Sequence, residues 1–407
     1  MEIDFDTYDP SFLQDPYPVL NRIREERPVF SARTGESDRP VWFLTRHADV
    51  QRALRDRRLG RVNQFVVDRD EWGLAPLRSD LGAFYDVEHW SLVWLEPPDH
   101  TRIRGLVSRA FTNKRIADLR PRIREHADRL LDAKLAEGRI DIVNDYSAPL
   151  SVHIIAELLG APTADWRSML DWSHRITRMY ETDDTDAHAA SAIEACVEFS
   201  GYCIDLITRR RAEPKDDLIS ALCFAETDDG KLTDPQIVSM MITLLNAGHE
   251  ATVNTLVNGA LALMQYPDQW RRIIEGDVET KTAVEELLRW DAPIQVFDRW
   301  VLVDDYEVAG QSIGKNEQVT LLLSSANRDP RQFDDPDSFD VGRGDTSHVS
   351  FGSGIHLCLG APLARLEVDV ALERLATKCP RLQLLEEPKR PPRFVLRGFD
   401  ALELAFA

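Results

Sequence analysis

The sequence predicts a mainly α-helical fold with small β-sheets at its periphery. In nine segments apolar residues recur at positions i, i+3, i+4 and i+7 with charged residues between them, the pattern of an amphipathic helix. Strand-like runs are short and cluster toward the two ends of the chain, so helices and strands do not alternate as a doubly wound sheet requires. No repeat and no Gly/Ser-rich or Pro-rich linker divides the sequence, which predicts a single domain over residues 1–407.

The predicted elements follow from these two periodicities. The 3.6-residue period predicts helices over residues 15–26, 46–56, 100–111, 117–136, 149–160, 187–212, 235–265, 280–290 and 361–376. Short runs of β-branched and aromatic residues predict strands over residues 41–44, 299–303 and 318–323, and alternation predicts another over residues 394–406.

The predicted helix 235–265 differs from the others in its length. Thr233 or Asp234 can cap it, Pro235 occupies its first position, and Tyr266-Pro267 ends it. At 1.5 Å per residue it is roughly 45 Å long, enough to cross a domain of this size. Its first half is apolar on nearly every side, which predicts that it is buried.

Polar residues nevertheless occupy the middle of this helix, in the run Asn246-Ala247-Gly248-His249-Glu250-Ala251-Thr252. Glycine in a helix costs about 1 kcal/mol relative to alanine, and an unpaired buried carboxylate costs several times more. Two interpretations account for these residues. They form a polar network that is satisfied within the core, or the helix opens onto a cavity in which Gly248 makes room for a flat or bulky group.

The charge balance limits the partners. The chain has 49 basic and 69 acidic residues, a net charge of −20, and such a field repels nucleic acid and anionic membranes. No segment reaches about 18 uncharged apolar residues, and the acidic N-terminus does not resemble a secretory signal. We therefore expect a soluble, cytoplasmic protein, a monomer that binds neither nucleic acid nor membrane.

One of the five cysteines differs from the rest. Without CxxC pairs or zinc-ligand spacing, the cysteines exclude a disulfide framework or a zinc site. Cys358 lies in a glycine-punctuated loop just before the predicted helix 361–376, where free amide N–H groups and the helix dipole favour the thiolate form. Such a thiolate is a nucleophile, with His356 as its base, or a metal ligand. The inert thiols are predicted to be Cys196, Cys203, Cys223 and Cys379.

The loop around Cys358 resembles that of a known family. Phe351, Gly354, His356, Cys358 and Gly360 match the FxxGxHxCxG haem-binding loop of the cytochrome P450 family. The resemblance, to the soluble bacterial members, implies the cytochrome P450 fold, a helical bundle with a long central helix and small peripheral antiparallel sheets. It also implies that Cys358 is the axial thiolate ligand of haem b (iron protoporphyrin IX), and that the other four residues bind this cofactor.

Two further motifs extend the resemblance. Glu286-Leu287-Leu288-Arg289 is similar to the ExxR helix of the family, and residues 333–339 with Arg343 are similar to its meander, which implies a structural lock on the core. By the same resemblance, the haem propionates are held by His100, Arg104, Arg299 and His356. Because His100 and Arg104 are four residues apart on a predicted helix, they share a face that suits a carboxylate.

The long helix resembles the oxygen-activating helix of the family, (A/G)-G-x-(D/E)-T-(T/S), with one departure. Gly248 takes the place next to the cofactor and Glu250 that of the acid, but Ala251 stands where the family has the threonine that hydrogen-bonds dioxygen. Thr252 lies about 100° further round the helix. A substrate hydroxyl or ordered water replaces the threonine, the helix shifts to bring in Thr252, or the enzyme runs one-electron coupling chemistry. Because Glu250 is retained, we favour the first explanation.

The resemblance also implies a function. The expected protein is a haem-thiolate monooxygenase of secondary metabolism that inserts one oxygen atom of O2 into a medium-sized apolar or aromatic organic substrate, or couples it oxidatively. The expected substrate contacts are Phe65, Trp90, Trp94, Tyr180, Leu244, Ala247, Ile294, Val296, Phe297, Phe394 and Val395. Their composition predicts a medium-sized, largely apolar or aromatic substrate, although core packing is the alternative for each of them.

Electrons are expected to come from a separate ferredoxin and ferredoxin reductase. The sequence has no flavin or nicotinamide fingerprint and no cysteine cluster for an iron–sulfur centre. An acidic ferredoxin needs a local basic patch, for which the candidates are Arg102, Arg109, Lys114, Arg115 and Arg365.

The sequence also contains a motif of a different class of enzyme, the serine hydrolases. Gly310-Gln311-Ser312-Ile313-Gly314 matches GxSxG, but a turn and a strand follow it where a hydrolase has a helix, so we predict a hairpin. A peroxide-driven haem enzyme and a non-catalytic haem sensor are the remaining alternatives.

Overall fold

The structure, a computed structural model, describes residues 5–33, 40–181, 186–227 and 230–406. The chain divides into two compact units, each assembled from separated segments. The first unit contains residues 1–60, 120–150 and 250–407, and the second contains residues 61–119 and 151–249. That residues 1–407 form a single domain stays a prediction.

The first unit combines helices with all the larger sheets. Its helices are α1 (Pro10–Gln14), α2 (Tyr17–Glu26), α3 (His47–Arg55), α8 (Arg120–Leu135), α14 (Pro267–Ile274), α15 (Thr280–Trp290), α16 (Leu323–Ala326) and α17 (Ala361–Lys378), with the helical turns η2 (Ile142–Ser147) and η5 (Gly354–His356). Its strands are β1 (Val29–Ala32), β2 (Val41–Leu44), β3 (Leu59–Gly60), β4 (Arg139–Asp141), β7 (Val296–Val301), β8 (Tyr306–Val308), β9 (Gln311–Ile313), β10 (Gln318–Leu322), β11 (Leu382–Leu384) and β12 (Glu403–Phe406).

The main sheet of this unit has the strand order β1-β2-β10-β7-β3. It is mixed, which corrects the expectation of antiparallel sheets: β10 runs parallel to β2, with Thr320 opposite Phe43. A parallel pair requires a long crossover, and the segment between these strands supplies one. The remaining pairs are antiparallel, as in β11-β12-β4 and in the β8-β9 hairpin.

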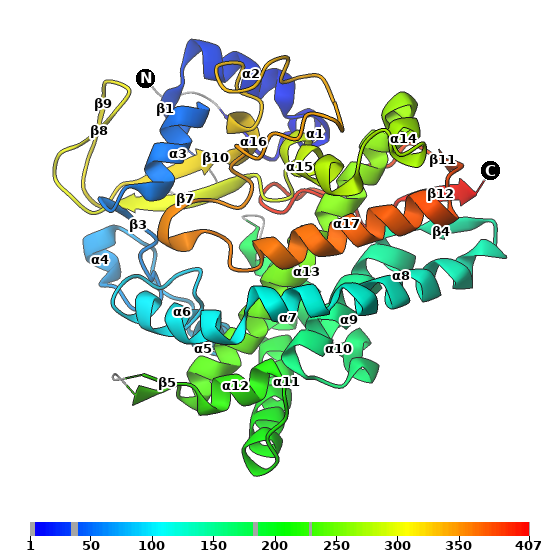
Figure 1. The fold of residues 1–407 in the computed structure, drawn as a ribbon. Helices are drawn as coiled ribbons and strands as arrows, with labels where there is room; N and C mark the ends of the chain where they lie inside the picture. The colour runs from blue at the N-terminus through cyan, green and yellow to red at the C-terminus, as the bar shows by residue number, and fades with distance from the viewer. Residues whose placement is uncertain (1–4, 34–39, 182–185, 228–229, 407) are drawn as a thin grey trace. The chain divides into compact units, whose positions relative to one another are not determined.

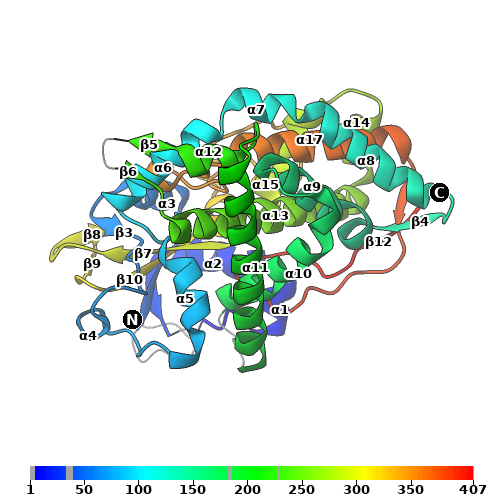
Figure 2. The same cartoon turned by 90° about the horizontal axis from the view of Figure 1, so that it is seen from below.

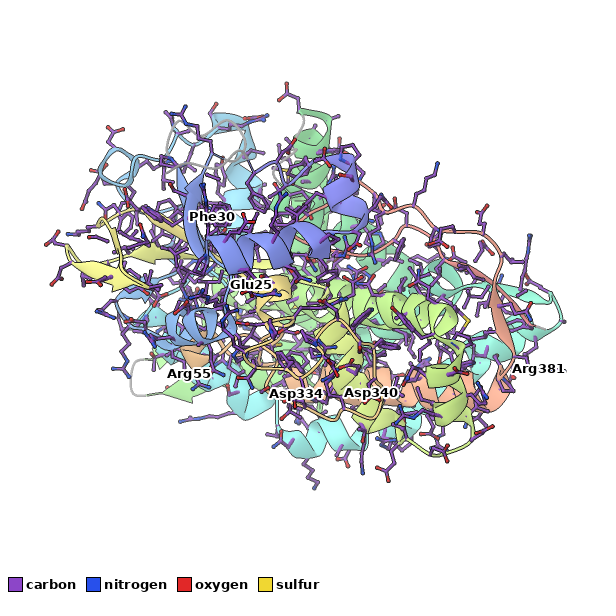
Figure 3. All side chains as sticks on the ribbon, turned by 90° about the horizontal axis from the view of Figure 1, so that it is seen from above. Glu25, Phe30, Arg55, Asp334, Asp340 and Arg381 are labelled. Carbon is purple, nitrogen blue, oxygen red and sulfur yellow. The ribbon has the colours of Figure 1, made fainter. Side chains whose placement is uncertain are left out.

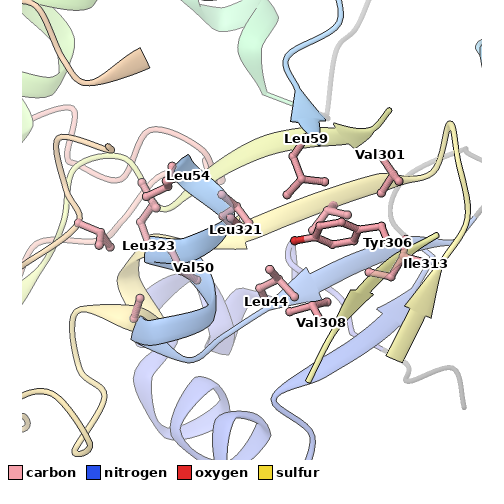
Figure 4. Packing of buried hydrophobic residues seen from close by; sticks show 14 residues of the cluster. Leu44, Val50, Leu54, Leu59, Val301, Tyr306, Val308, Ile313, Leu321 and Leu323 are labelled. Carbon is pink, nitrogen blue, oxygen red and sulfur yellow. The ribbon is translucent and has the colours of Figure 1, made fainter. Parts of the chain in front are cut away.

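Both faces of this sheet are buried. In β10, Leu321 belongs to the cluster that also contains Val50 of α3 and Tyr306 (Figure 4), whereas Leu322 belongs to a second cluster on the other face. The second cluster is rich in phenylalanine, and its Phe30, labelled in Figure 3, stacks on Phe43 with ring centroids 5.1 Å apart. Alternate side chains thus serve opposite faces.

α17 and α8 lie side by side in the first unit (Figure 1). Several ion pairs join them, among them Arg124 to Glu373 at 2.7 Å and Arg374 to Asp128 at 2.6 Å. α17 begins with Pro362 in its first turn, a position where proline loses no helical hydrogen bond. This helix therefore starts at a fixed place directly after the Cys358 loop.

The second unit is helical apart from one short hairpin. Its helices are α4 (Arg69–Trp72), α5 (Gly82–His89), α6 (Asp99–Ala110), α7 (Asn113–Asp118), α10 (Trp166–Thr177), α11 (Asp186–Ala212) and α12 (Leu218–Phe224), its helical turns are η1 (Ser79–Leu81), η3 (Thr163–Asp165) and η4 (Arg178–Tyr180), and its strands are β5 (Glu226–Thr227) and β6 (Gly230–Lys231). α10 and α11 pack side by side (Figure 2), where Trp172 stacks on Phe199 at 5.0 Å.

Two helices contribute residues to both units, α9 (Ala148–Leu159) and α13 (Asp234–Gln265). α13 is the predicted long helix, and it is α-helical from end to end. The Gln236 side-chain oxygen accepts the Thr233 N–H at 3.0 Å and so satisfies an amide at its start. In the described part of the chain, no helix is long and apolar enough to cross a membrane.

The C-terminal strand prediction is wrong over most of its length. Only Glu403–Phe406 forms a strand, and the preceding residues are irregular. The reason is a side-chain anchor. Arg397 donates to Asp291 at 2.7 Å and to the Leu13 carbonyl at 2.6 Å, and these bonds hold the segment in place. The strand predicted over residues 299–303 instead covers Val296–Val301.

Candidate functional site

Cys358 is the exposed cysteine, whereas the other four are buried. Its amide donates a hydrogen bond to the Phe351 carbonyl at 2.9 Å, which closes the loop before α17. Gly354 has a φ of +71°, and a Cβ there would lie 2.5 Å from the Leu54 carbonyl oxygen. Only glycine fits this close approach. The loop therefore presents the Cys358 sulfur at the head of α17.

The other thiols are held neutral by their surroundings. Burial raises the pKa of Cys196 to about 12 and that of Cys379 to about 11, and it also raises the pKa of Cys203 and Cys223. Thiols of this kind are poor nucleophiles and poor metal ligands. This agrees with their prediction as inert thiols.

A polar network that was not predicted from the sequence supports the Cys358 loop. The Arg365 guanidinium lies 4.4 Å from the centre of the Phe351 ring and donates to both oxygens of Glu285, at 2.7 and 3.0 Å. The buried His348 contacts the same carboxylate at 3.1 Å. Burial alone would raise the pKa of Glu285, but the hydrogen bonds from His348 and Arg365 lower it to about 2. No motif in the sequence predicts this network.

Glu286 and Arg289 form a buried ion pair on α15. Two parallel hydrogen bonds of 2.7 and 2.8 Å join them, and both side chains are fully buried. Arg289 also donates to the Asn327 and Pro336 carbonyls, at 3.0 and 2.9 Å. Glu286 in turn accepts the amide of Asp340, a residue labelled in Figure 3, at 2.9 Å. The pair thus fastens α15 to the meander segment, as the resemblance implied.

Arg299 and His356 both lie near one aromatic ring, that of Phe297, in the first unit. Arg299 is on β7, 2% exposed, with its guanidinium 4.5 Å from the centre of the Phe297 ring. The His356 ring is 6.5 Å from the same ring. Two of the predicted carboxylate-binding residues are therefore brought together, although they lie in different segments.

The other two predicted residues, His100 and Arg104, lie on α6 in the second unit. His100 is 2% exposed, and its amide donates to the Glu96 carbonyl at 3.0 Å as the helix begins. Because α6 is regular from Asp99, His100 and Arg104 occupy the same helix face one turn apart.

One face of α13 is accessible in the middle of an otherwise buried helix. Leu244, Ala247, Gly248 and Ala251, at positions i, i+3, i+4 and i+7, are half-buried or exposed, while every other residue from 245 to 253 is buried. Small side chains on an open stripe leave room for a flat group. Thr252 is only 6% exposed and does not belong to this stripe, whereas Ala251 does.

Gly248 also packs closely against a neighbouring helix. A Cβ at this position would lie 2.7 Å from the Cδ1 atom of Ile155 in α9. The absence of a side chain therefore lets α9 and α13 approach each other here, and the place of Gly248 next to the cofactor stays a prediction. Ala247 and Ala251 form the open stripe together with Gly248.

The predicted substrate residues fall into separate groups. In the first unit, Val296 and Phe394 are buried in the phenylalanine-rich cluster, Val395 packs against it, and Ile294 and Phe297 border the other cluster. In the second unit, Trp90 packs against the neighbouring His89 ring, with ring centroids 4.7 Å apart. Phe65 contacts Trp94 edge to face at 5.6 Å. Their contact with substrate stays a prediction.

Ser312 of the GxSxG motif lies on β9, opposite Glu307 in the β8-β9 hairpin. A hydrolase would require it at a sharp strand-to-helix elbow. The predicted hairpin is confirmed, and this serine has no such presentation.

These residues fit a haem. In the first unit, an exposed sulfur at a helix start, a loop that only glycine can form, and the buried Arg299 match an iron ligand and a cation for a carboxylate. That His100 and Arg104 of the second unit bind a carboxylate stays a prediction. The stripe of small residues on α13 suits a planar macrocycle. The chemistry of the donors therefore agrees with the cofactor that the sequence motif implied.

Comparisons with known proteins point the same way. The Cytochrome P450 family model matches residues 78–276 and 279–394. The polyketide biosynthesis cytochrome P450 PksS of Bacillus subtilis (strain 168) is 34% identical over 409 residues, covering 99% of this chain and 98% of that protein. The vitamin D(3) 25-hydroxylase of Pseudonocardia autotrophica is 38% identical over 380 residues, covering 93% and 90%. The crystal structure of P450BioI in complex with hexadec-9Z-enoic acid ligated acyl carrier protein, 31% identical, matches with a TM-score of 0.89 over 98% of this chain and 99% of that one.

Proposed function

This chain belongs to the cytochrome P450 family, and from that premise we propose that it oxidises a medium-sized, largely apolar or aromatic molecule, with haem b as cofactor and a ferredoxin as electron donor. It is a monooxygenase with a haem-thiolate cofactor, a small-molecule substrate and separate redox partners. Its place is the cytoplasm, where it acts as a monomer.

The observation that carries this proposal is Cys358, the exposed thiol at the head of α17. A haem iron held by a thiolate supplies the activation of O2 for insertion of one oxygen atom into substrate. Cys358 would hold the iron through its sulfur. Arg299, His356, His100 and Arg104 would hold the two carboxylates through charge-assisted hydrogen bonds.

Proton supply falls to α13. Glu250 is 8% exposed, and its carboxyl group can hold a proton and pass it to a water or hydroxyl within reach. Ala251 contributes no hydroxyl on the open stripe. In this proposal an ordered water or a substrate hydroxyl takes the place of the missing side chain.

The absorption spectrum of the reduced, carbon monoxide-bound protein tests the assignment. We expect the strongly red-shifted Soret band of thiolate ligation, and we expect Cys358→His to replace it with a histidine-type spectrum, because imidazole donates less charge to iron. Cys379→Ser, which removes a buried thiol, is the matched control and should keep the wild-type band. A histidine-type spectrum in the unaltered protein would contradict the proposal.

The nature of the relatives supports an apolar substrate. One is named for polyketide biosynthesis and another as a vitamin D(3) hydroxylase, and a third has a fatty acyl carrier protein in its crystal structure. All three names indicate large apolar skeletons. The aromatic residues around Phe65 and Trp94 offer a surface of the same chemistry.

A basic patch on α6 and α7 supports docking of an acidic ferredoxin. Arg109 and Lys114 are exposed, while Arg102 and Arg115 also belong to the patch but pair with Asp99 and Asp216. Arg365, in the first unit, is occupied by Glu285. Arg109 and Lys114 are therefore the cations most available to a partner.

Reversing both charges, in Arg109→Glu/Lys114→Glu, should slow reduction by ferredoxin about tenfold at low salt and flatten its salt dependence, because steering needs complementary charge. Stopped-flow reduction at several salt concentrations measures this effect. Arg57→Glu/Arg58→Glu, which changes the same number of charges outside α6 and α7, is the charge-matched control. If both double variants slow reduction equally, net charge and not this patch is responsible.

Ala251 also favours a second candidate, a peroxide-driven oxygenase. Hydrogen peroxide brings its own protons, so a helix without the threonine hydroxyl would lose less in that reaction. Product formed with hydrogen peroxide alone, at a rate equal to that with ferredoxin, would favour this candidate. Haem binding without any turnover would indicate a sensor.

A further inference from the structure

A buried carboxylate joins two of the predicted substrate residues in the second unit. Glu88, in the last turn of α5, is 3% exposed. Its Oε2 atom accepts the Trp94 indole N–H at 2.6 Å, and its Oε1 atom accepts the Tyr180 hydroxyl at 3.0 Å. One side chain therefore fixes residues that belong to the loop after α5 and to η4, far apart in the sequence.

Trp94 is held on three sides. Besides the bond to Glu88, the Arg61 guanidinium stacks 4.2 Å from the centre of its ring, and Phe65 meets it edge to face at 5.6 Å and 86°. Arg61 is itself directed, because its Nε atom donates to the Val93 carbonyl at 2.9 Å. The indole plane thus has a single defined orientation.

Tyr180 connects the same group to α13. The Asn246 side chain adjoins its hydroxyl, and Asn246 directly precedes Ala247 of the open stripe. Burial raises the pKa of Tyr180 well above its ordinary value, and the charge of Glu88 adds to this effect. The phenol therefore stays protonated and remains a donor to Glu88.

Glu88 is costly to keep in this place. A buried carboxylate needs hydrogen bonds to offset its loss of hydration, and those it receives here come from neutral donors. Burial raises the pKa of Glu88, against the opposing effects of Trp94, Tyr180 and the Arg61 charge. An apolar residue at this position would pack at lower cost but would leave two buried donors without an acceptor.

We propose that Glu88 is a specificity-determining residue, which locks Trp94 and Tyr180 into one aromatic wall and thereby selects substrates with a flat apolar surface. This inference rests on the proposed function, since it assigns the wall to the substrate side of the monooxygenase. Glu88 itself acts through the two aromatic residues, so it is a positioning residue. Without it, both side chains gain rotational freedom, and a rigid ligand must order them on binding.

Two azoles of different size test the proposal. Imidazole binds haem iron and is too small to need an aromatic wall, whereas clotrimazole binds iron through the same ring and carries three aryl groups. Both Kd values are measured from the Soret shift. The ratio of the clotrimazole Kd to the imidazole Kd, here called the azole ratio, separates the contribution of the aromatic wall from that of the bond to iron. We expect Glu88→Ala to weaken clotrimazole about tenfold relative to imidazole, and Tyr180→Phe about threefold, as expected for two lost hydrogen bonds and one.

Tyr202→Phe is the matched control. The Tyr202 hydroxyl also donates to a carboxylate, Asp165, at 2.9 Å in the same unit, but it takes no part in this group. We expect its azole ratio to equal that of the unaltered protein. Glu88→Gln should retain part of the ratio, because its amide oxygen still accepts one donor. The double variant Glu88→Ala/Tyr180→Phe should match Glu88→Ala alone, since the hydroxyl acts through Glu88.

An unchanged ratio in both Glu88→Ala and Tyr180→Phe, with only a lower melting temperature, would overturn the proposal and leave Glu88 a structural residue. If Glu88→Ala does not fold, Tyr180→Phe decides, because it removes a single oxygen. Failure of the proposed function would look different. The unaltered protein would then lack the thiolate band in its carbon monoxide spectrum, whatever the azole ratio.

Discussion

Replacing Arg289 by alanine should cost about 3–5 kcal/mol in the free energy of unfolding, because it removes the bidentate partner of a buried carboxylate and leaves Glu286 only the Asp340 amide at 2.9 Å and Arg343 at 3.3 Å. Both side chains of this pair have no exposed area. A domain is typically stable by only about 5–15 kcal/mol, so much of the variant would be unfolded or lack cofactor. Urea denaturation followed by circular dichroism measures the loss.

An exposed pair with the same geometry provides the control. Arg331 donates to both oxygens of Glu25, at 2.8 and 2.7 Å, but the two side chains are 45% and 50% exposed. Water replaces such a bond readily, so Glu25→Ala, which leaves the bond from Arg331 to the buried Asp329 at 3.2 Å intact, should cost about 0–1 kcal/mol. Equal losses in the two variants would show that burial does not set the strength of the Arg289 pair.

The helices were predictable where their periodicity was apolar. All nine predicted helices are present, and the starts of α13 and α17 follow from their proline and capping residues. α10 was not predicted, although Met169 and Ile176 lie on its buried face beside Ser173 and Thr177.

Only part of the candidate site could be predicted from the sequence. Cys358 could be found from local chemistry, because its loop and the following helix are contiguous in the sequence. Glu88 could not, since its partners are Trp94 and Tyr180 and nothing in the α5 sequence distinguishes it from a surface glutamate. The same holds for Glu285, whose partners His348 and Arg365 come from two later segments. Contacts between distant segments require the tertiary structure.

Replacing Ala251 by threonine should reduce the hydrogen peroxide released per NAD(P)H by about tenfold, a modest share of what a positioned proton donor contributes. Ala251 lies on the open stripe of α13, so a hydroxyl there would face the accessible side, whereas Thr252 is buried. A plant-type ferredoxin and its reductase can supply electrons, and peroxide and NAD(P)H are measured together. The effect should be largest with substrates that carry no hydroxyl group, since a substrate hydroxyl already performs this role.

Ala251→Val separates the hydroxyl from the shape of the side chain, because valine and threonine are both β-branched and nearly equal in size. Helix propensity is also similar, so the two variants should be equally stable. We expect peroxide release to fall in Ala251→Thr and to stay high in Ala251→Val. A fall of the same size in both would mean that the added bulk excludes water, and proton delivery in this enzyme would then depend on Glu250 and ordered water without any need for a hydroxyl at this position.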